Sequence, residues 1–156
     1  MSQIKKASRR LERSFALKVL YGLCFSPADT EKDLRDAFLR SPDRPDTMDK
    51  QNGYAWSLVF NVWRHREALD KAIASFSQNW RVERLGKIEA ALLRIAFWEL
   101  IQDDPDVPPK VAINEAVELS KQYSDEKSRG FINGILDGAA KARDTGTLLK
   151  NFKETA

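Results

Sequence analysis

Hydrophobic residues recur every three or four positions along most of this chain, the spacing of one face of an α-helix. The first such helix is predicted over residues 8–25, and it should end before Pro27. The residues expected on its buried face are Leu11, Phe15, Ala16, Val19, Leu20 and Leu23. Alternation with period two never persists beyond a few residues, so β-strands are not expected.

The middle of the chain predicts a short helix and then a long helical region. The short helix covers residues 31–39, and the loop 41–47 after it is rich in proline, aspartate, serine and threonine. The long region begins near Met48 and should bend near His65 or Asp70. Its expected buried residues are Tyr54, Leu58, Val62, Leu69, Ile73 and Phe76.

Three more helices are predicted in the second half. The segment KIEAALLRIAFWEL follows Gly86 and is apolar on nearly every side, which is typical of a central helix in a bundle. Prolines 108 and 109 suit the start of the next helix, because the first-turn N–H groups have no intrahelical partner. Expected buried residues of the last two helices are Ala112, Ile113, Ala116, Val117 and Ser120, then Phe131, Ile132, Ile135, Leu136 and Ala139. The pattern predicts an all-α protein of about seven helices.

Composition limits the class of protein. The 156 residues are enough for one well-buried domain, and 31% charged with 42% apolar residues suits a soluble globular chain. No uncharged stretch approaches the roughly 18–20 residues that span a bilayer, and no signal peptide is apparent at the N-terminus. The one cysteine, Cys24, lies in an apolar run and is expected to be buried. These features favour the cytoplasm.

Positive charge is concentrated at the N-terminus. The net charge is +3, yet the first 18 residues hold six lysines and arginines against one glutamate. Lys6, Arg10 and Arg13 follow i, i+4, i+7 spacing, with Arg9 at the edge, so we expect a basic stripe on a different face from the core stripe. Arginines on a helix can hold phosphates and stack on unpaired bases, which favours single-stranded RNA as a ligand. A solubilising tail is the alternative.

Residues that could carry catalysis are scarce. His65 is the only histidine, Cys24 the only cysteine, and no glycine-rich phosphate loop is present. We therefore expect no enzyme activity, no metal and no cofactor. Lys127 and Arg129 are predicted in the first turn of the last helix, just before Phe131, where an anionic ligand would explain their placement. Ordinary solvation of the two cations and burial of the ring remain sufficient explanations.

Four segments, in this order, resemble the NusB family of bacterial antitermination factors: RRLERSFALKVLY, LGKIEAALLRIAFWEL, VPPKVAINEAVELSK and FINGILD. The resemblance extends over most of the chain. It implies an all-helical fold of two small bundles set against each other. Accordingly, one domain is expected over 1–143, with sub-bundles of roughly 1–80 and 81–143. Residues 144–156 would be a polar extension in which Leu148, Leu149 and Phe152 could dock weakly.

The resemblance also implies a function. Members of the family pair with NusE, a small-subunit ribosomal protein, and together they bind the boxA element of nascent RNA, notably in ribosomal RNA operons. Other Nus factors and RNA polymerase would be reached indirectly, and no membrane is involved. The sequence does not decide whether the protein forms a homodimer.

Position by position, the resemblance assigns residues to two partners. The residues matched to the RNA-contacting surface are Arg9, Arg10, Arg13, Lys87 and Phe131, which Lys6, Lys127 and Arg129 would extend. Those matched to the NusE-facing side are Tyr21, Glu83 and Glu89. Ser14 and Lys127 stand where the family usually has acidic residues, so both make the surface more positive and leave the preferred RNA sequence open.

Other functions are compatible with the same helices. A helical adaptor that binds only protein would use the basic helix for solubility. NusB-like domains also form the N-terminal part of some ribosomal RNA cytosine methyltransferases, and this chain would be a stand-alone relative because it lacks room for the catalytic domain. A helix-turn-helix DNA binder is disfavoured, since no short turn sets up a recognition helix.

Overall fold

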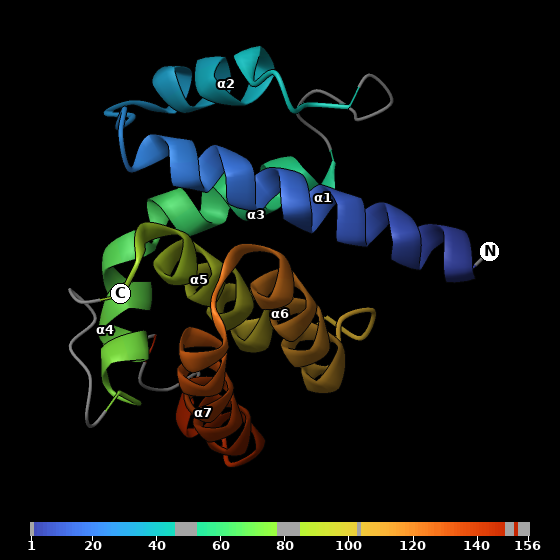
Figure 1. Cartoon of the computed structure of the whole chain (residues 1–156), viewed down its shortest axis with the longest axis vertical. Helices are drawn as coiled ribbons and strands as arrows, with labels where there is room; N and C mark the ends of the chain where they lie inside the picture. Colours follow the sequence, from blue (N-terminus) through green and yellow to red (C-terminus); the bar gives the residue numbers. More distant parts are fainter. Residues whose placement is uncertain (1, 46–52, 78–84, 103, 149–151, 153–156) are drawn as a thin grey trace. The chain divides into compact units, whose positions relative to one another are not determined.

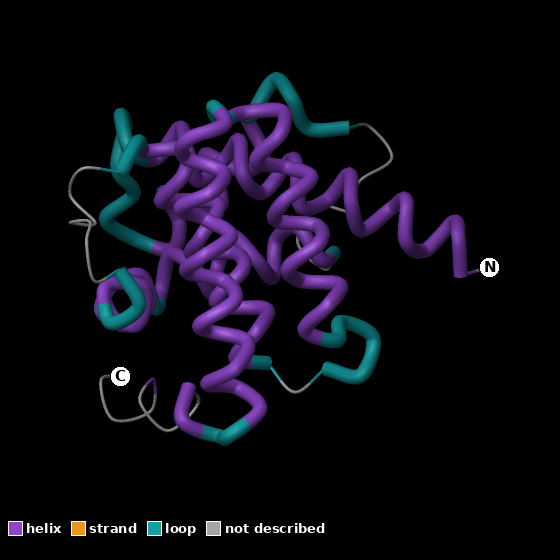
Figure 2. Tube along the Cα trace, turned by 60° about the horizontal axis from the view of Figure 1, so that its bottom comes forward, coloured by secondary structure: helices purple, strands orange, loops and turns teal. Residues whose placement is uncertain are grey.

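The fold is built from helices. The computed structural model describes residues 2–45, 53–77, 85–102, 104–148 and 152, and for residues 2–8 it describes the backbone alone. These ranges contain seven helices and no strand, as the hydrophobic spacing predicts (Figures 1 and 2). None of the seven is both long and apolar enough to cross a bilayer.

The chain divides into two compact units, Met1–Arg64 and His65–Ala156. The expected boundary near residue 80 is therefore wrong. A helix that was assigned to the first bundle, α4 (Arg66–Ala74), packs on α5 (Lys87–Ile101) in the second unit. Arg94 of α5 makes two hydrogen bonds to the Asp70 carboxylate of α4, at 2.7 and 3.0 Å. These bonds help to explain why α4 belongs to unit 2.

Unit 1 is formed by three helices. α1 (Ser2–Leu23) packs along α3 (Tyr54–Arg64), and α2 (Glu31–Arg40) contacts both (Figure 1). The N-cap of α2 is Thr30, whose side chain accepts a hydrogen bond from the Asp33 N–H at 3.1 Å. The core between the helices includes edge-to-face aromatic contacts from Phe38 to Phe15 and to Trp56.

The buried face of α1 differs from the predicted one. Leu11 is 51% exposed instead of buried, whereas Leu17 and Arg13 are buried. With 100° between successive residues, the observed face is centred between Ala16 and Leu20, and Leu11 lies almost opposite that centre. The predicted basic stripe and the core stripe thus overlap at Arg13. Leu23, also expected in the core, is half-buried.

The long helical region is interrupted at His65, one of the two predicted positions: α3 ends at Arg64 and α4 begins at Arg66. The His65 ring stacks on Trp98 of α5, with centroids 5.0 Å apart.

Phe76 follows the end of α4 and is half-buried rather than fully buried. Its ring lies against Gly138, where a Cβ would come within 3.1 Å, so a glycine allows this close approach.

Unit 2 is organised around α5. This helix contacts α4, α6 (Pro109–Tyr123) and α7 (Glu126–Asp144), and it is buried on most sides, as its apolar sequence predicts (Figure 1).

The buried face of α6 is rotated from the predicted one. Leu119 and Glu115 are buried, at 5% and 4% exposure, whereas Ile113 and Val117 are only half-buried. A glutamate does not signal a core position, so hydrophobic spacing alone placed the centre of this face too far toward Ile113.

The end of the chain belongs to unit 2. α7 continues to Asp144, and beyond it Leu148 and Phe152 are 1% and 7% exposed. The Phe152 ring lies 5.8 Å from that of His65, so the predicted polar extension contributes side chains to the core. Leu149 lies outside the described residues.

The rotated face of α6 can be tested with two substitutions in one helix. Leu119→Ala should lower the free energy of unfolding by about 2–5 kcal/mol, because a buried leucine leaves a cavity. Ile113→Ala should cost about 1–2 kcal/mol, because the side chain is already partly solvated. Urea unfolding followed by circular dichroism measures both. Equal losses, or a larger loss for Ile113→Ala, would contradict the observed face.

Candidate nucleic-acid interface

The arginines of α1 differ from one another in exposure. Arg10 is exposed, Arg9 is half-buried, and Arg13 is 2% exposed. Arg9 and Arg13 are one turn apart, on the side of α1 that packs against α3, whereas Arg10 is turned toward solvent. The expectation of three arginines on one accessible stripe is therefore wrong for Arg13. Lys6 lies on the described backbone of α1, and its side chain is outside the described residues.

The Tyr54 ring contacts the two less exposed arginines, Arg9 and Arg13. The guanidinium carbon of Arg9 is 4.4 Å from the centre of the Tyr54 ring, and that of Arg13 is 5.5 Å away. A cation within about 6 Å of an aromatic face is attracted by the ring quadrupole, most strongly where water is excluded. Tyr54 thus fixes two positive groups at the start of α3.

A second contact ties α1 to the same end of α3. The Glu12 carboxylate accepts a hydrogen bond from the Ala55 backbone N–H at 3.3 Å. The first N–H groups of a helix lack intrahelical acceptors, and the helix dipole favours a negative charge there. Glu12 therefore satisfies one of these groups while holding its own turn of α1 in place.

The first turn of α7 carries the predicted cations Lys127 and Arg129. Its N-cap is Asp125, whose carboxylate accepts a hydrogen bond from the Ser128 N–H at 2.7 Å. This bond and one from the Ser128 side chain, with the charges of Lys127 and Arg129, lower the pKa of Asp125 below its usual 3.8. Because Asp125 stays ionised at neutral pH, it offsets part of the positive charge of this turn.

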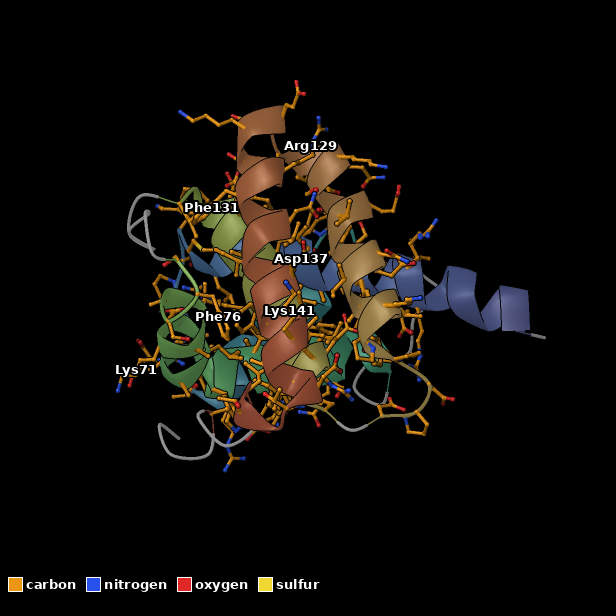
Figure 3. The ribbon with its side chains drawn as sticks, turned by 90° about the horizontal axis from the view of Figure 1, so that it is seen from below. Lys71, Phe76, Arg129, Phe131, Asp137 and Lys141 are labelled. Atoms are coloured by element: carbon orange, nitrogen blue, oxygen red, sulfur yellow. The ribbon has the colours of Figure 1, made fainter. Side chains whose placement is uncertain are left out.

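Phe131 and Arg129 project to opposite sides of α7 (Figure 3). The 100° step per residue places Lys127 on the Phe131 side, about 40° away around the helix. Phe131 is half-buried and Lys127 is exposed. A single ligand surface can therefore use Lys127 with Phe131, and the predicted trio is not brought together.

Lys87 is the exposed first residue of α5, and its turn is linked to the end of α6. The Glu89 carboxylate accepts a hydrogen bond from the Ser124 hydroxyl at 3.0 Å. A Cβ at residue 86 would collide with the Glu89 carboxylate, so Gly86 allows this side chain to fold back. Glu89, predicted to face a protein partner, thus also has a partner within unit 2.

Tyr21 forms an exposed aromatic pair with Phe25 at the end of α1. Tyr21 is 39% exposed and Phe25 is 62% exposed, and their rings meet edge to face with centroids 5.1 Å apart. Exposed apolar side chains that lie together offer area that a partner protein can bury. Glu83, the other residue predicted for this partner, lies outside the described residues.

The described residues contain no group of three histidine, cysteine, aspartate or glutamate side chains that could hold a metal ion. Cys24 is half-buried rather than fully buried, and its thiol donates to the Leu20 carbonyl oxygen at 3.6 Å.

Tyr54 and Glu12 are the contributors to this site that the sequence pattern did not identify. Tyr54 was assigned to the core by its helical spacing, and Glu12 was counted only as a charge. No local spacing relates residue 54 to residues 9 and 13. The packing of α1 on α3 brings them together.

Comparison with known proteins identifies the family. The NusB family model matches residues 10–141. The transcription antitermination protein NusB of Nitratidesulfovibrio vulgaris (strain DSM 19637 / Miyazaki F) is 52% identical, covering 94% of this chain and 96% of that protein. The transcription antitermination protein NusB of Oleidesulfovibrio alaskensis is 54% identical, covering 91% and 93%.

Solved structures agree with these relatives. The NusB of T. maritima superposes with a TM-score of 0.73 at 30% identity, covering 85% of this chain and 90% of that one. A chain in the crystal structure of a plectonemic RNA supercoil gives a TM-score of 0.71 at 28% identity, covering 88% and 96%. From the family model, the curated relatives and the shared fold, the chain belongs to the NusB family of transcription antitermination proteins.

Proposed function

We propose that this protein acts in antitermination by binding single-stranded boxA RNA through Arg9 and Arg10 of α1, together with NusE. The observation that carries the proposal is the arginine cluster of α1, in which Tyr54 orders Arg9 and Arg13 while Arg10 faces solvent. It acts without catalysis, in the cytoplasm, and reaches other Nus factors and RNA polymerase through these two partners.

Charge distribution supports a polyanionic ligand for unit 1. Met1–Arg64 contains twelve lysines and arginines against eight aspartates and glutamates, a net charge of +4, and the rest of the chain has a net charge of −1. Positive charge gathered on one unit raises the local concentration of RNA and speeds its association. Lys87, Lys127 and Phe131 of unit 2 are the additional contacts that we assign to RNA.

A similar chain in an RNA-containing crystal structure supports RNA over an adaptor that binds protein alone. Arginine also suits this ligand better than lysine would, because its planar guanidinium can hold a phosphate through two hydrogen bonds. We therefore rank the adaptor second.

We assign Tyr21 and Glu89 to the NusE contact. The Tyr21–Phe25 pair offers apolar area that a partner would bury, and aromatic residues often dominate the binding energy of such contacts. Glu89 adds negative charge that a basic ribosomal protein would meet.

The RNA assignment is tested by Arg10→Ala. This change should weaken binding of labelled boxA RNA, measured with NusE present, by about tenfold, the effect of losing one good charged contact. It should also reduce the slope of log affinity against log salt by about 0.7, because one fewer phosphate is neutralised. Lys71→Ala, which removes an exposed cation of α4, is the matched control and should change neither value.

Wild-type protein that fails to bind this RNA in low salt with NusE present would refute the RNA function and leave the adaptor.

The role of Glu89 is tested by two substitutions that separate charge from hydrogen bonding. Glu89→Lys should weaken NusE binding by about tenfold or more through repulsion of a basic partner. Glu89→Gln keeps an acceptor for the Ser124 hydroxyl but removes the charge, so it should weaken NusE binding by a smaller factor. Calorimetric titration measures both. Glu118→Lys, an exposed substitution of the same charge change on α6, is the control. Glu89 has no part in the NusE contact if Glu89→Lys and Glu118→Lys bind equally.

A further inference from the structure

We propose that Tyr54 is a positioning residue for RNA binding: its ring, which also contacts the buried Arg13, holds the Arg9 guanidinium in place before RNA binds. This inference rests on the proposed function and assigns a residue of α3 to it. Tyr54 itself need not touch the RNA.

The geometry separates the roles of the two arginines. Both guanidiniums lie over the same ring, Arg9 at 4.4 Å and Arg13 at 5.5 Å from its centre. Arg13 is 2% exposed, so it cannot reach a ligand without leaving the core. Arg9 is half-buried and its guanidinium Nη1 is buried, so a phosphate of single-stranded RNA would have to meet the part of this side chain that stays exposed.

The ring is itself held in position. Tyr54 is the first residue of α3, and the next residue donates its backbone N–H to Glu12, which lies between Arg9 and Arg13 on α1. One turn of α1 therefore meets the start of α3 through a hydrogen bond and two cation–ring contacts. Three contacts between the same two turns restrict both the ring and the arginines.

Ordering a long side chain in advance increases affinity, since less rotamer freedom is lost when the ligand binds. Arginine has several rotatable bonds, and a free arginine on a helix surface would lose that freedom on every encounter with RNA. A ring that already holds the guanidinium removes part of this loss. The expected benefit is a factor of about three to ten in RNA affinity, the size of one cation–ring contact.

The experiment compares Tyr54→Leu with Tyr54→Phe in the full-length protein. Binding of labelled single-stranded boxA RNA is measured with NusE present. Tyr54→Leu should weaken binding by about three- to tenfold, and Tyr54→Phe, which retains the ring, should bind within about twofold of wild type. Arg9→Ala should weaken binding in the wild-type background and much less in the Tyr54→Leu background, because the leucine variant has already lost the ordered arginine.

A core substitution in the same helix distinguishes positioning from general stability. Leu58 is 1% exposed in α3, so Leu58→Ala destabilises unit 1 while retaining the Tyr54 ring. At a temperature where circular dichroism shows all variants folded, Leu58→Ala should bind RNA as wild type does.

Three results would overturn the inference. Tyr54→Leu could bind as wild type does, Tyr54→Phe could lose as much as Tyr54→Leu, or the Arg9→Ala and Tyr54→Leu losses could be additive. Each leaves the proposed function standing as long as wild type binds RNA and Arg10→Ala weakens that binding. Absence of binding by wild type itself would instead refute the proposed function.

Discussion

A guanidinium buried against an aromatic ring is the interaction on which the candidate RNA surface depends. Arg13 is 2% exposed on a helix whose neighbouring buried residues are apolar, and removing a charge from water is costly unless other groups compensate. The Tyr54 ring, 5.5 Å from its guanidinium carbon, provides one such compensation. Because the same ring also meets Arg9, a change at Tyr54 affects both the environment of the buried Arg13 and the order of Arg9.

This coupling follows from the limited circumference of α1. The helix must bury one side against α3 and present cations on another, yet Arg9 and Arg13 lie on the side that packs against α3. Long side chains resolve the conflict, because an arginine can pack its stem against apolar neighbours while its charged end lies elsewhere. A lysine at residue 13 would keep the charge but lose the planar group that lies over the ring.

The hydrophobic spacing predicted the seven helices and the break at His65, because helix formation is governed by local spacing, proline positions and capping residues. It was less accurate where a polar residue lies in a buried face. Glu115 on α6 and Arg13 on α1 are both buried, and in each helix the observed buried face is rotated by about 60° from the predicted one. The site was predicted in part: its arginines are visible as charge along the sequence, whereas Tyr54 depends on a contact between residues more than forty positions apart.

Glu89 presents the same coupling in unit 2. Its carboxylate accepts from the Ser124 hydroxyl, and Ser124 directly precedes Asp125, the N-cap of α7. A link between the first turn of α5 and the junction of α6 with α7 therefore holds together the backbone segments that carry Lys87 and Lys127. A carboxylate needs only one of its acceptor sites for this bond, since two oxygens offer about four. Glu89 is half-buried, so its negative charge is partly exposed, and the residue that links the segments assigned to RNA is also the one that we assign to the NusE contact.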